Sequence, residues 1–323
     1  MPRPSFDHAN RASAYLAALL LLMLVSACRV PSDLGQAAEP AITAVPVALP
    51  STNTAAPPQA AGANQQAPVP QPAGLVRPDN SLLRYTGRFD FSDPLRPRFD
   101  WPAVMIEAAF SGPSVAVLLE DGRNSYDVSV DGQSSVLRTR PGQTRYLLAE
   151  GLGSGPHQLR LTKRTETFYG TPEFLGLELA PGGRLLTLPG ENGRLIEFVG
   201  DSITAGYGVE GSSPTCVYSP ETENAALTYA AQTAEMLDAA YTVVAVSGVG
   251  VVRNYNDEGP LSSGTMLTYY GRTLANEPIE DWQAAQPPQA VVINLGTNDF
   301  STTPQPAGEL FLNGYTNLIF KIR

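Results

Sequence analysis

The stretch that decides the fold runs from Leu195 to Gly208. It reads Leu195-Ile196-Glu197-Phe198-Val199 followed by Gly200-Asp201-Ser202-Ile203-Thr204-Ala205-Gly206-Tyr207-Gly208. The first five residues are typical of a short buried strand, and a glycine-flanked turn follows at once. A serine in such a turn has an exposed hydroxyl and backbone N–H donors nearby, which is the environment of a nucleophile. The plainer interpretation is a helix N-cap, because Asp and Ser both favour that position.

Strands and helices alternate after this turn. Residues 225–240 predict a helix, and residues 241–246 and 290–295 predict buried strands. The order predicts a mainly parallel sheet with helices on both faces, a three-layer α/β domain over residues 191–323. Ser247-Gly248 follows one of these strands and Asn298-Asp299 follows the other. In such sheets the working residues gather where strands end, so three candidate blocks are expected to meet there.

The preceding region, residues 81–190, has a period of two. Apolar residues alternate over 104–110, 115–119 and 126–130, and Asp-Gly pairs at Asp121-Gly122 and Asp131-Gly132 supply turns. Short strands without a long helical stretch predict an antiparallel β-sandwich, jelly-roll-like in character.

The N-terminal segment is predicted to direct the protein to the cell envelope. Residues 1–27 have the form of a signal peptide, whose apolar core is too short to span a bilayer. Val25-Ser26-Ala27-Cys28 resembles the lipobox of bacterial lipoproteins, which implies a lipid anchor at Cys28 and a location in the cell envelope, on the outer side of a bacterial membrane. An ordinary secretory signal is the alternative. Residues 28–80 are rich in Pro and Ala and predict a flexible linker.

Composition narrows the classes of function. The formal charge is -10, which argues against an electrostatic nucleic-acid binder. Two cysteines and two histidines leave almost nothing for a His/Cys metal site, so we expect no metal and no cofactor.

Taken together, the three blocks resemble the SGNH, or GDSL, hydrolase superfamily. Residues 196–204, 219–225 and 294–300, with the sandwich residues 85–90 and 163–166, are similar to carbohydrate esterase family two. That family pairs a jelly roll with an SGNH domain and deacetylates plant polysaccharides such as xylan or glucomannan. The resemblance therefore implies an acetylated polysaccharide or oligosaccharide as the substrate.

The resemblance also implies roles for particular residues. Ser202 Oγ would attack the acetyl carbonyl, and the backbone N–H groups of Ser202 and Gly248 with the Asn298 amide would bind the oxyanion. Removing one such donor typically costs roughly 10² to 10³ in rate. Asp201 and Asp299 are expected to hold the loops. Trp282 is the aromatic residue that we would test first for contact with sugar.

The general base of the superfamily is a histidine in an Asp-x-x-His motif, which these 323 residues lack. His8 lies in the signal segment, and His157 is expected to be structural within the sandwich. Leu310 to Arg323 begins an amphipathic helix without a stop signal. We therefore expect a C-terminally truncated chain that is itself inactive, with a degenerate relative as the second possibility.

Two other functions stay open on the sequence. One is an SGNH lipase or arylesterase, which differs in the acyl group that it removes. The other is a non-catalytic surface lipoprotein that binds carbohydrate through the sandwich.

Overall fold

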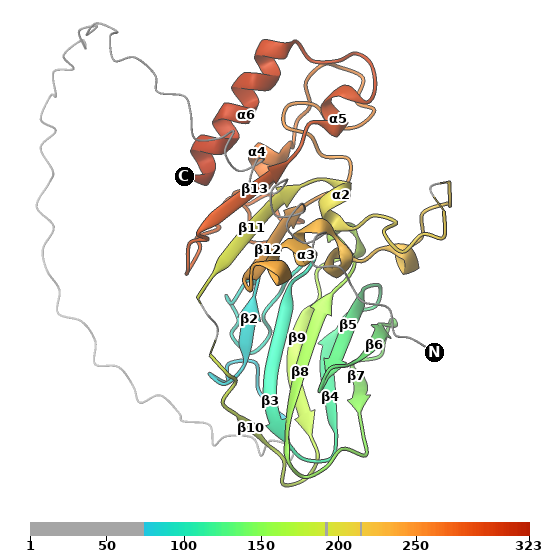
Figure 1. Cartoon of the computed structure of the whole chain (residues 1–323), viewed down its shortest axis with the longest axis vertical. Helices are drawn as coiled ribbons and strands as arrows, with labels where there is room; N and C mark the ends of the chain where they lie inside the picture. The colour runs from blue at the N-terminus through green and yellow to red at the C-terminus, as the bar shows by residue number, and fades with distance from the viewer. Residues whose placement is uncertain (1–73, 191–192, 214) are drawn as a thin grey trace, which may run out of the picture. The chain divides into compact units, whose positions relative to one another are not determined.

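Alternating apolar residues build two antiparallel sheets in the N-terminal region. The computed structural model describes residues 74–190, 193–213 and 215–323, all within one compact unit (Figure 1). One sheet has the order β1-β9-β4-β7 and the other β10-β3-β8-β5-β6, with β2 paired to β3. The strands are β1 (Leu75–Val76), β2 (Arg84–Thr86), β3 (Met105–Ser111), β4 (Val115–Glu120), β5 (Ser125–Val130), β6 (Gln133–Arg138), β7 (Arg145–Ala149), β8 (Pro156–Lys163), β9 (Glu173–Leu179) and β10 (Arg184–Leu186).

The predicted antiparallel β-sandwich is confirmed. The apolar side chains of both sheets form one core, which includes Phe99, Phe110, Tyr126 and Phe174. Burial of this apolar surface is what favours the fold. The predicted linker ended at residue 80, but β1 lies inside that range and pairs with β9. The predicted signal peptide, Cys28 and the remainder of the predicted linker before residue 74 lie outside the described residues.

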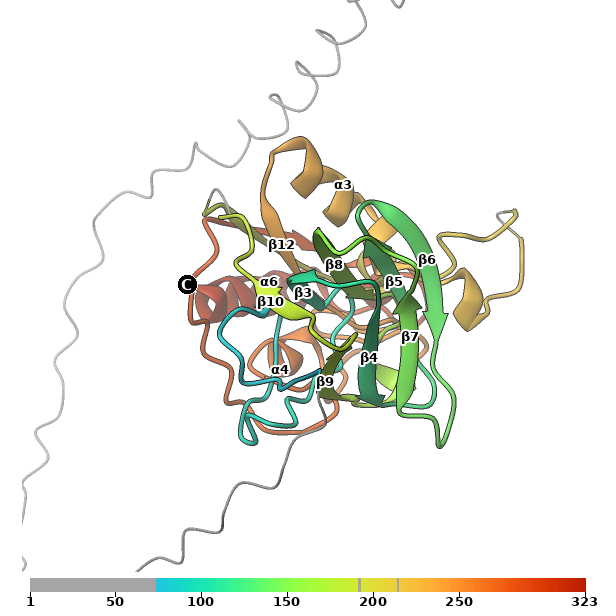
Figure 2. The same cartoon turned by 90° about the horizontal axis from the view of Figure 1, so that it is seen from below.

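A parallel sheet follows the sandwich. Its three strands, β11 (Leu195–Gly200), β12 (Ala240–Ala245) and β13 (Ala290–Asn294), have the order β12-β11-β13. Phe198 aligns with Val243 on one side and with Val292 on the other. Figure 1 shows this sheet above the sandwich, and in Figure 2, seen from below, the sandwich lies in front of it.

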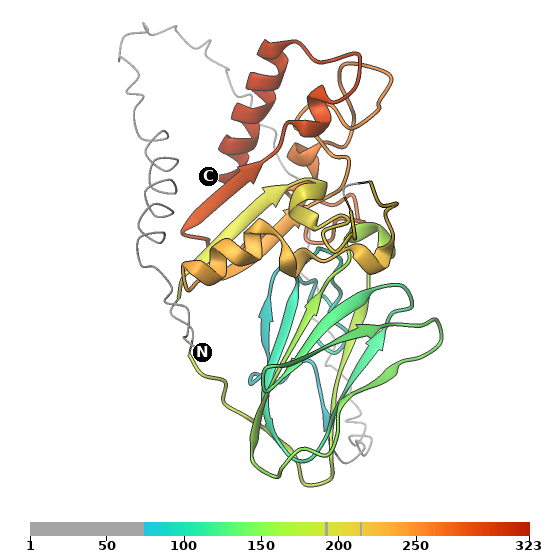
Figure 3. The ribbon, with the colours of Figure 1, turned by 45° about the vertical axis from the view of Figure 1, so that its right-hand side comes forward.

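Helices pack on the two faces of the parallel sheet (Figure 3). Phe198 and Val243 share a cluster with Ala230 and Ala234 of α3 (Tyr229–Met236). The next residues along the strands, such as Val199, point the other way and share a cluster with Leu318 of α6 (Gly308–Ile322). Because successive side chains of a strand alternate between faces, this division confirms the three-layer α/β arrangement.

The predicted helix over residues 225–240 is shorter in the structure. Ala225–Leu227 form the 3₁₀ turn η4, and Thr228 is extended, with a ψ of 169°, before α3 begins at Tyr229. Asp238 has a φ of +49°, which ends the helical path. Ala240 already belongs to β12. Local hydrogen bonding by Asn224, whose side chain accepts from the Ala226 N–H, favours the separate turn.

The remaining helical segments are short. They are α2 (Ser202–Ala205), α4 (Met266–Tyr269), α5 (Thr297–Phe300), η2 (Thr167–Tyr169) and η3 (Pro220–Thr222). Among the described residues, no helix combines the length and apolar character needed to cross a membrane.

A buried arginine joins the sandwich to the α/β region. Arg88 is 1% exposed, and its guanidinium lies 4.8 to 5.4 Å from the ring centroids of Trp101, Tyr270 and Trp282. Its Nη1 donates to the backbone carbonyls of Tyr270 and Arg272, and its Nη2 lies 3.4 Å from Glu197 Oε2. This one side chain therefore links residues of both regions.

Candidate active site

The end of β11 places Ser202 at the edge of the sheet. Asp201 caps the short helix α2, because its carboxylate accepts the Ile203 N–H at 3.0 Å. A Cβ at Gly200 would lie 2.0 Å from Thr204 Oγ1, so only glycine allows the strand to turn this tightly. Ser202 itself is half-buried.

The Asn298 side chain brings the three predicted blocks together. Asn298 is 6% exposed, and its Nδ2 donates to Val249 O at 2.9 Å and to Asp201 Oδ2 at 3.3 Å. Asp201 directly precedes Ser202, and Val249 directly follows Gly248. One amide therefore contacts the neighbours of both other residues predicted for the site.

Gly248 has a backbone conformation that favours glycine. Its φ is +79°, and a Cβ built there would meet only the Tyr255 side chain, at 3.9 Å. Its carbonyl accepts the Tyr255 N–H at 2.8 Å. The positive φ, rather than lack of space, is the reason for glycine at this position.

Asp299 holds the loop that follows Gly248. It is fully buried, and its carboxylate accepts the backbone N–H groups of Val251, Val252 and Arg253 at 2.8 to 2.9 Å. The pKa of Asp201 is raised, mainly because burial disfavours its charged form and secondarily because of the charge on Asp299. Both carboxylates thus accept backbone N–H groups in the loops of the site.

His157 is the one histidine among the described residues, and it belongs to the sandwich. Its Nδ1 lies 2.6 Å from Asp131 Oδ2 and its Nε2 lies 2.9 Å from Gly153 O. The hydrogen bond with Gly153 and that with Asp131 raise the pKa of His157. Both ring nitrogens therefore have partners inside the sandwich.

Trp282 lies against Arg88, with its ring centroid 4.8 Å from the guanidinium carbon. Its backbone N–H donates to Gly271 O at 2.9 Å. The structure thus places Trp282 beside the buried arginine, whose carboxylate partner Glu197 precedes Ser202 by five residues on β11.

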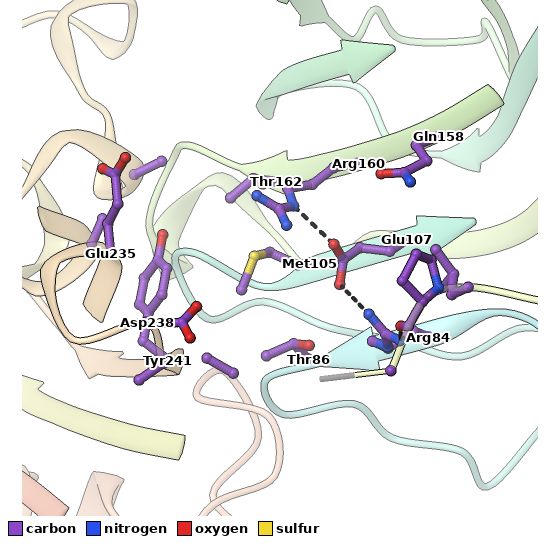
Figure 4. A pocket seen from close by; sticks show the side chains of 17 residues that line it. Arg84, Thr86, Met105, Glu107, Gln158, Arg160, Thr162, Glu235, Asp238 and Tyr241 are labelled. Atoms are coloured by element: carbon purple, nitrogen blue, oxygen red, sulfur yellow. Dashed lines mark hydrogen bonds and ion pairs between the residues drawn. The ribbon is translucent and has the colours of Figure 1, made fainter. Parts of the chain in front are cut away.

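A separate cavity of about 770 Å³ lies between the sandwich and α3 (Figure 4). On its sandwich wall Glu107 lies between Arg84 and Arg160, at 3.7 and 2.9 Å. Glu235 and Tyr241 are on the other wall. None of the predicted site residues lines this cavity.

Sequence reasoning missed two buried charged residues beside the site. Glu166, in the sandwich, contacts Ser247, which precedes Gly248. The Arg253 side chain donates to the backbone carbonyls of Asp257 and Gly259. It therefore fixes the part of the loop that follows the residues bound by Asp299. Glu166 lies in the run 163–166 quoted above, but a run of polar residues usually indicates a solvated surface, so its burial could not be predicted from the local pattern.

Potential metal ligands are sparse in the described part of the chain. Across residues 74–190, 193–213 and 215–323, no group of three or more His, Cys, Asp and Glu side chains is placed to hold a metal ion. Cys216 is a half-buried free thiol.

Comparison with known proteins gives the family. Residues 85–189 match the model of the carbohydrate esterase 2 N-terminal region, and residues 198–323 match that of the GDSL-like lipase/acylhydrolase family. The chain is 40% identical over 251 residues to a cellulase/esterase CelE of Acetivibrio thermocellus, covering 76% of this chain and 30% of that protein. It is 39% identical to an acetylxylan esterase / glucomannan deacetylase of Cellvibrio japonicus, covering 65% of this chain and 58% of that protein.

A solved structure agrees with both regions. A family two carbohydrate esterase from Clostridium thermocellum, determined in complex with cellohexaose, is 38% identical with a TM-score of 0.70. The match covers 75% of this chain and 73% of the Clostridium chain. With its sandwich, its parallel sheet and the three blocks at the sheet edge, the chain belongs to carbohydrate esterase family two.

Proposed function

We propose that this chain carries the nucleophile and oxyanion site of a carbohydrate O-deacetylase. The observation that carries the proposal is the Asn298 amide, which contacts the residue before Ser202 and the residue after Gly248. In the proposed reaction Ser202 Oγ forms a bond to the acetyl carbonyl carbon, and the carbonyl oxygen becomes an oxyanion. The backbone N–H groups of Ser202 and Gly248 stabilise that charge, and the Asn298 amide joins them by exchanging its longer hydrogen bond, the 3.3 Å contact with Asp201 Oδ2, for the oxyanion.

The intermediate then collapses. The bond to the sugar oxygen breaks, that oxygen takes up a proton, and an acetyl group stays on Ser202. Water attacks the acetyl-serine and releases acetate. Both halves of the cycle need a base to remove a proton, first from Ser202 and then from water.

The described residues do not supply a histidine for this task near Ser202, because His157 is bound within the sandwich. We propose that the 323 residues alone hydrolyse esters very slowly, since loss of the base of a serine hydrolase costs on the order of 10⁶ in turnover. Imidazole added to the solution is a base of the same chemical kind as a histidine side chain, and we expect it to raise the rate at Ser202.

The substrate class is proposed from the relatives. One is named an acetylxylan esterase / glucomannan deacetylase, and another was determined with cellohexaose. We propose acetylated polysaccharide of the xylan or glucomannan type as the substrate of this chain.

The test measures acetate released from acetylated xylan and acetylated glucomannan, with and without added imidazole. We expect slow release that imidazole accelerates beyond its own action without protein, and Ser202→Ala should lower the release to that background. Ester substrates with longer acyl chains should react less well. Acetate release that is unchanged by Ser202→Ala, or absent even with imidazole, contradicts the proposed function. Preference for long acyl chains favours a lipase or arylesterase instead.

We also propose that the chain is held in the cell envelope by a lipid on Cys28. The support is the signal-like N-terminus and the lipobox resemblance of residues 25–28. Metabolic labelling with a palmitate analogue should tag the wild-type protein and leave Cys28→Ala unlabelled. Equal labelling of both proteins overturns the anchor.

A further inference from the structure

The end of strand β8 carries a buried run of polar residues. Lys163, Thr165 and Glu166 are each fully buried, and Arg164 is 4% exposed. Charged side chains are rarely buried unless they are paired. The hydrogen-bond partners of these residues therefore indicate their role.

Glu166 contacts the residue that precedes Gly248. Its Oε2 accepts the Ser247 N–H at 2.7 Å, and its Oε1 accepts the Ser247 hydroxyl at 2.5 Å. Two acceptors on one rigid carboxyl fix both the backbone and the side chain of Ser247. The peptide group that carries the Gly248 N–H begins at Ser247. The direction of that N–H therefore depends on how Glu166 holds Ser247.

Glu166 is itself held from two sides. Its N–H donates to Glu223 Oε1 at 3.0 Å, and its carbonyl accepts from Lys163 Nζ at 3.2 Å. Glu223 accepts the Tyr218 hydroxyl at 2.7 Å. These bonds hold the backbone of Glu166 and the side chain of Glu223 in place, and a network of this kind leaves Glu166 little freedom to move.

Tyr218, the partner of Glu223, also connects this network to Ser202. Tyr218 stacks on Tyr207, with ring centroids 3.7 Å apart and an interplanar angle of 8°. The Tyr207 N–H donates to Ser202 O at 3.0 Å. The sandwich residue Glu166 is thus connected to both the Gly248 loop and the Ser202 turn.

We propose that Glu166 is a positioning residue that sets the direction of the Gly248 N–H toward the oxyanion formed at Ser202. This inference rests on the proposed function and gives the sandwich a specific part in the reaction. It does not require Glu166 to touch the substrate.

The carboxyl group of Glu166 lies among other buried ionisable groups. Burial, and then the neighbouring Glu223, raise the pKa of Glu166. Burial also raises the pKa of Glu223, and desolvation lowers the pKa of Lys163 to about 8. The groups that face Glu166 are thus Lys163 at the end of β8, Glu223 from the segment before α3, and Ser247 from the loop after β12.

The experiment compares wild type with Glu166→Gln, Glu166→Ala and Ser247→Ala in imidazole-supported hydrolysis of p-nitrophenyl acetate, after the hydrolysis by imidazole alone is subtracted. We expect Glu166→Ala to lower kcat by about 10- to 100-fold with KM unchanged, since a small misplacement of a catalytic group costs about that much. Glu166→Gln keeps one acceptor oxygen and Ser247→Ala keeps the backbone N–H bond, so both should lose less. Glu178→Gln is the matched control, because Glu178 pairs with Arg145 on the exposed surface of the sandwich.

Hydrogen exchange of the same variants gives a readout that needs no activity. Exchange of backbone amides in residues 246–252 should accelerate in Glu166→Ala, while strand β3 exchanges as in wild type. Unchanged kcat and unchanged exchange at 246–252 overturn the inference. Loss of protection throughout the sandwich also overturns it, because Glu166 is then merely a folding residue.

The outcomes separate the two proposals. If Ser202→Ala hydrolyses the ester as fast as wild type, the proposed function fails, and hydrogen exchange alone decides whether Glu166 fixes the loop. If Ser202→Ala is inactive and the Glu166 variants behave as wild type, only the positioning role fails.

Discussion

At the scale of single residues, Gly248 allows a matched test of backbone strain against function. Gly248 and Gly132 share a φ of +79°, and a Cβ meets no close neighbour at either position. Alanine at each should therefore lower the free energy of unfolding by about 1 to 2 kcal/mol, the cost of a left-handed non-glycine residue. Urea unfolding measures this cost, and Gly132→Ala in the β5–β6 turn is the control.

Activity should distinguish the two glycine variants. Gly248→Ala is expected to reduce imidazole-supported esterase activity well beyond Gly132→Ala, because only Gly248 is proposed to donate to the oxyanion. Equal activities in the two variants contradict that role.

The sequence singles out Ser202, Gly248 and Asn298 as candidates because each lies just after a strand, in a local pattern that can be read without the fold. Glu166 could not be found in this way. Its partner Ser247 is 81 residues distant along the chain, and its burial depends on packing between the sandwich and the α/β region. Long-range contacts of this kind leave no local periodicity.

At the scale of elements, the junction between the end of β8 and the loop before α3 should make stability depend on pH. Glu166 and Glu223 are buried carboxyl groups whose pKa values are raised above the usual 4.5. The neutral forms are favoured in the folded state, so the folded chain binds more protons than the unfolded chain above that pH. The free energy of unfolding should then fall as pH rises from about 4.5 through the raised pKa values.

The measurement is urea unfolding at a series of pH values. Glu166→Gln removes one of the two titrating groups and the repulsion on the other, so its stability should fall less steeply with pH. A slope equal to that of wild type argues against a raised pKa at this junction.

Elements with a clear apolar period were predictable, and others were not. The strands β3, β4 and β5 are mostly buried and have apolar residues at alternate positions, but β6 exposes nearly all of its residues and therefore shows no apolar alternation. The segment 225–240 has helical composition, yet the local bonds of Asn224 and the left-handed Asp238 divide it. Composition sets propensity, whereas such local contacts set the ends of elements.

At the scale of the whole molecule, Arg88 should couple the stability of the sandwich to that of the α/β region. Arg88→Ala leaves the buried Glu197 without its cation and removes the packing against three aromatic rings. Breaking a buried pair by removing one partner costs about 3 to 5 kcal/mol. Scanning calorimetry should show one unfolding transition that moves to lower temperature as a whole.

The control for this prediction is Arg145→Ala, which breaks an exposed pair with Glu178 on the sandwich and should change stability little. Two separate transitions in the wild-type protein, only one of them shifted by Arg88→Ala, contradict the coupling.

The position of Arg88 has an optical consequence. The chain has two tryptophans, Trp101 and Trp282, and both indoles lie on this one guanidinium from opposite sides of the junction. Tryptophan emission therefore comes from a single place in the molecule, and a red shift reports water entering there. Opening of the two regions can be followed in real time without attaching a dye.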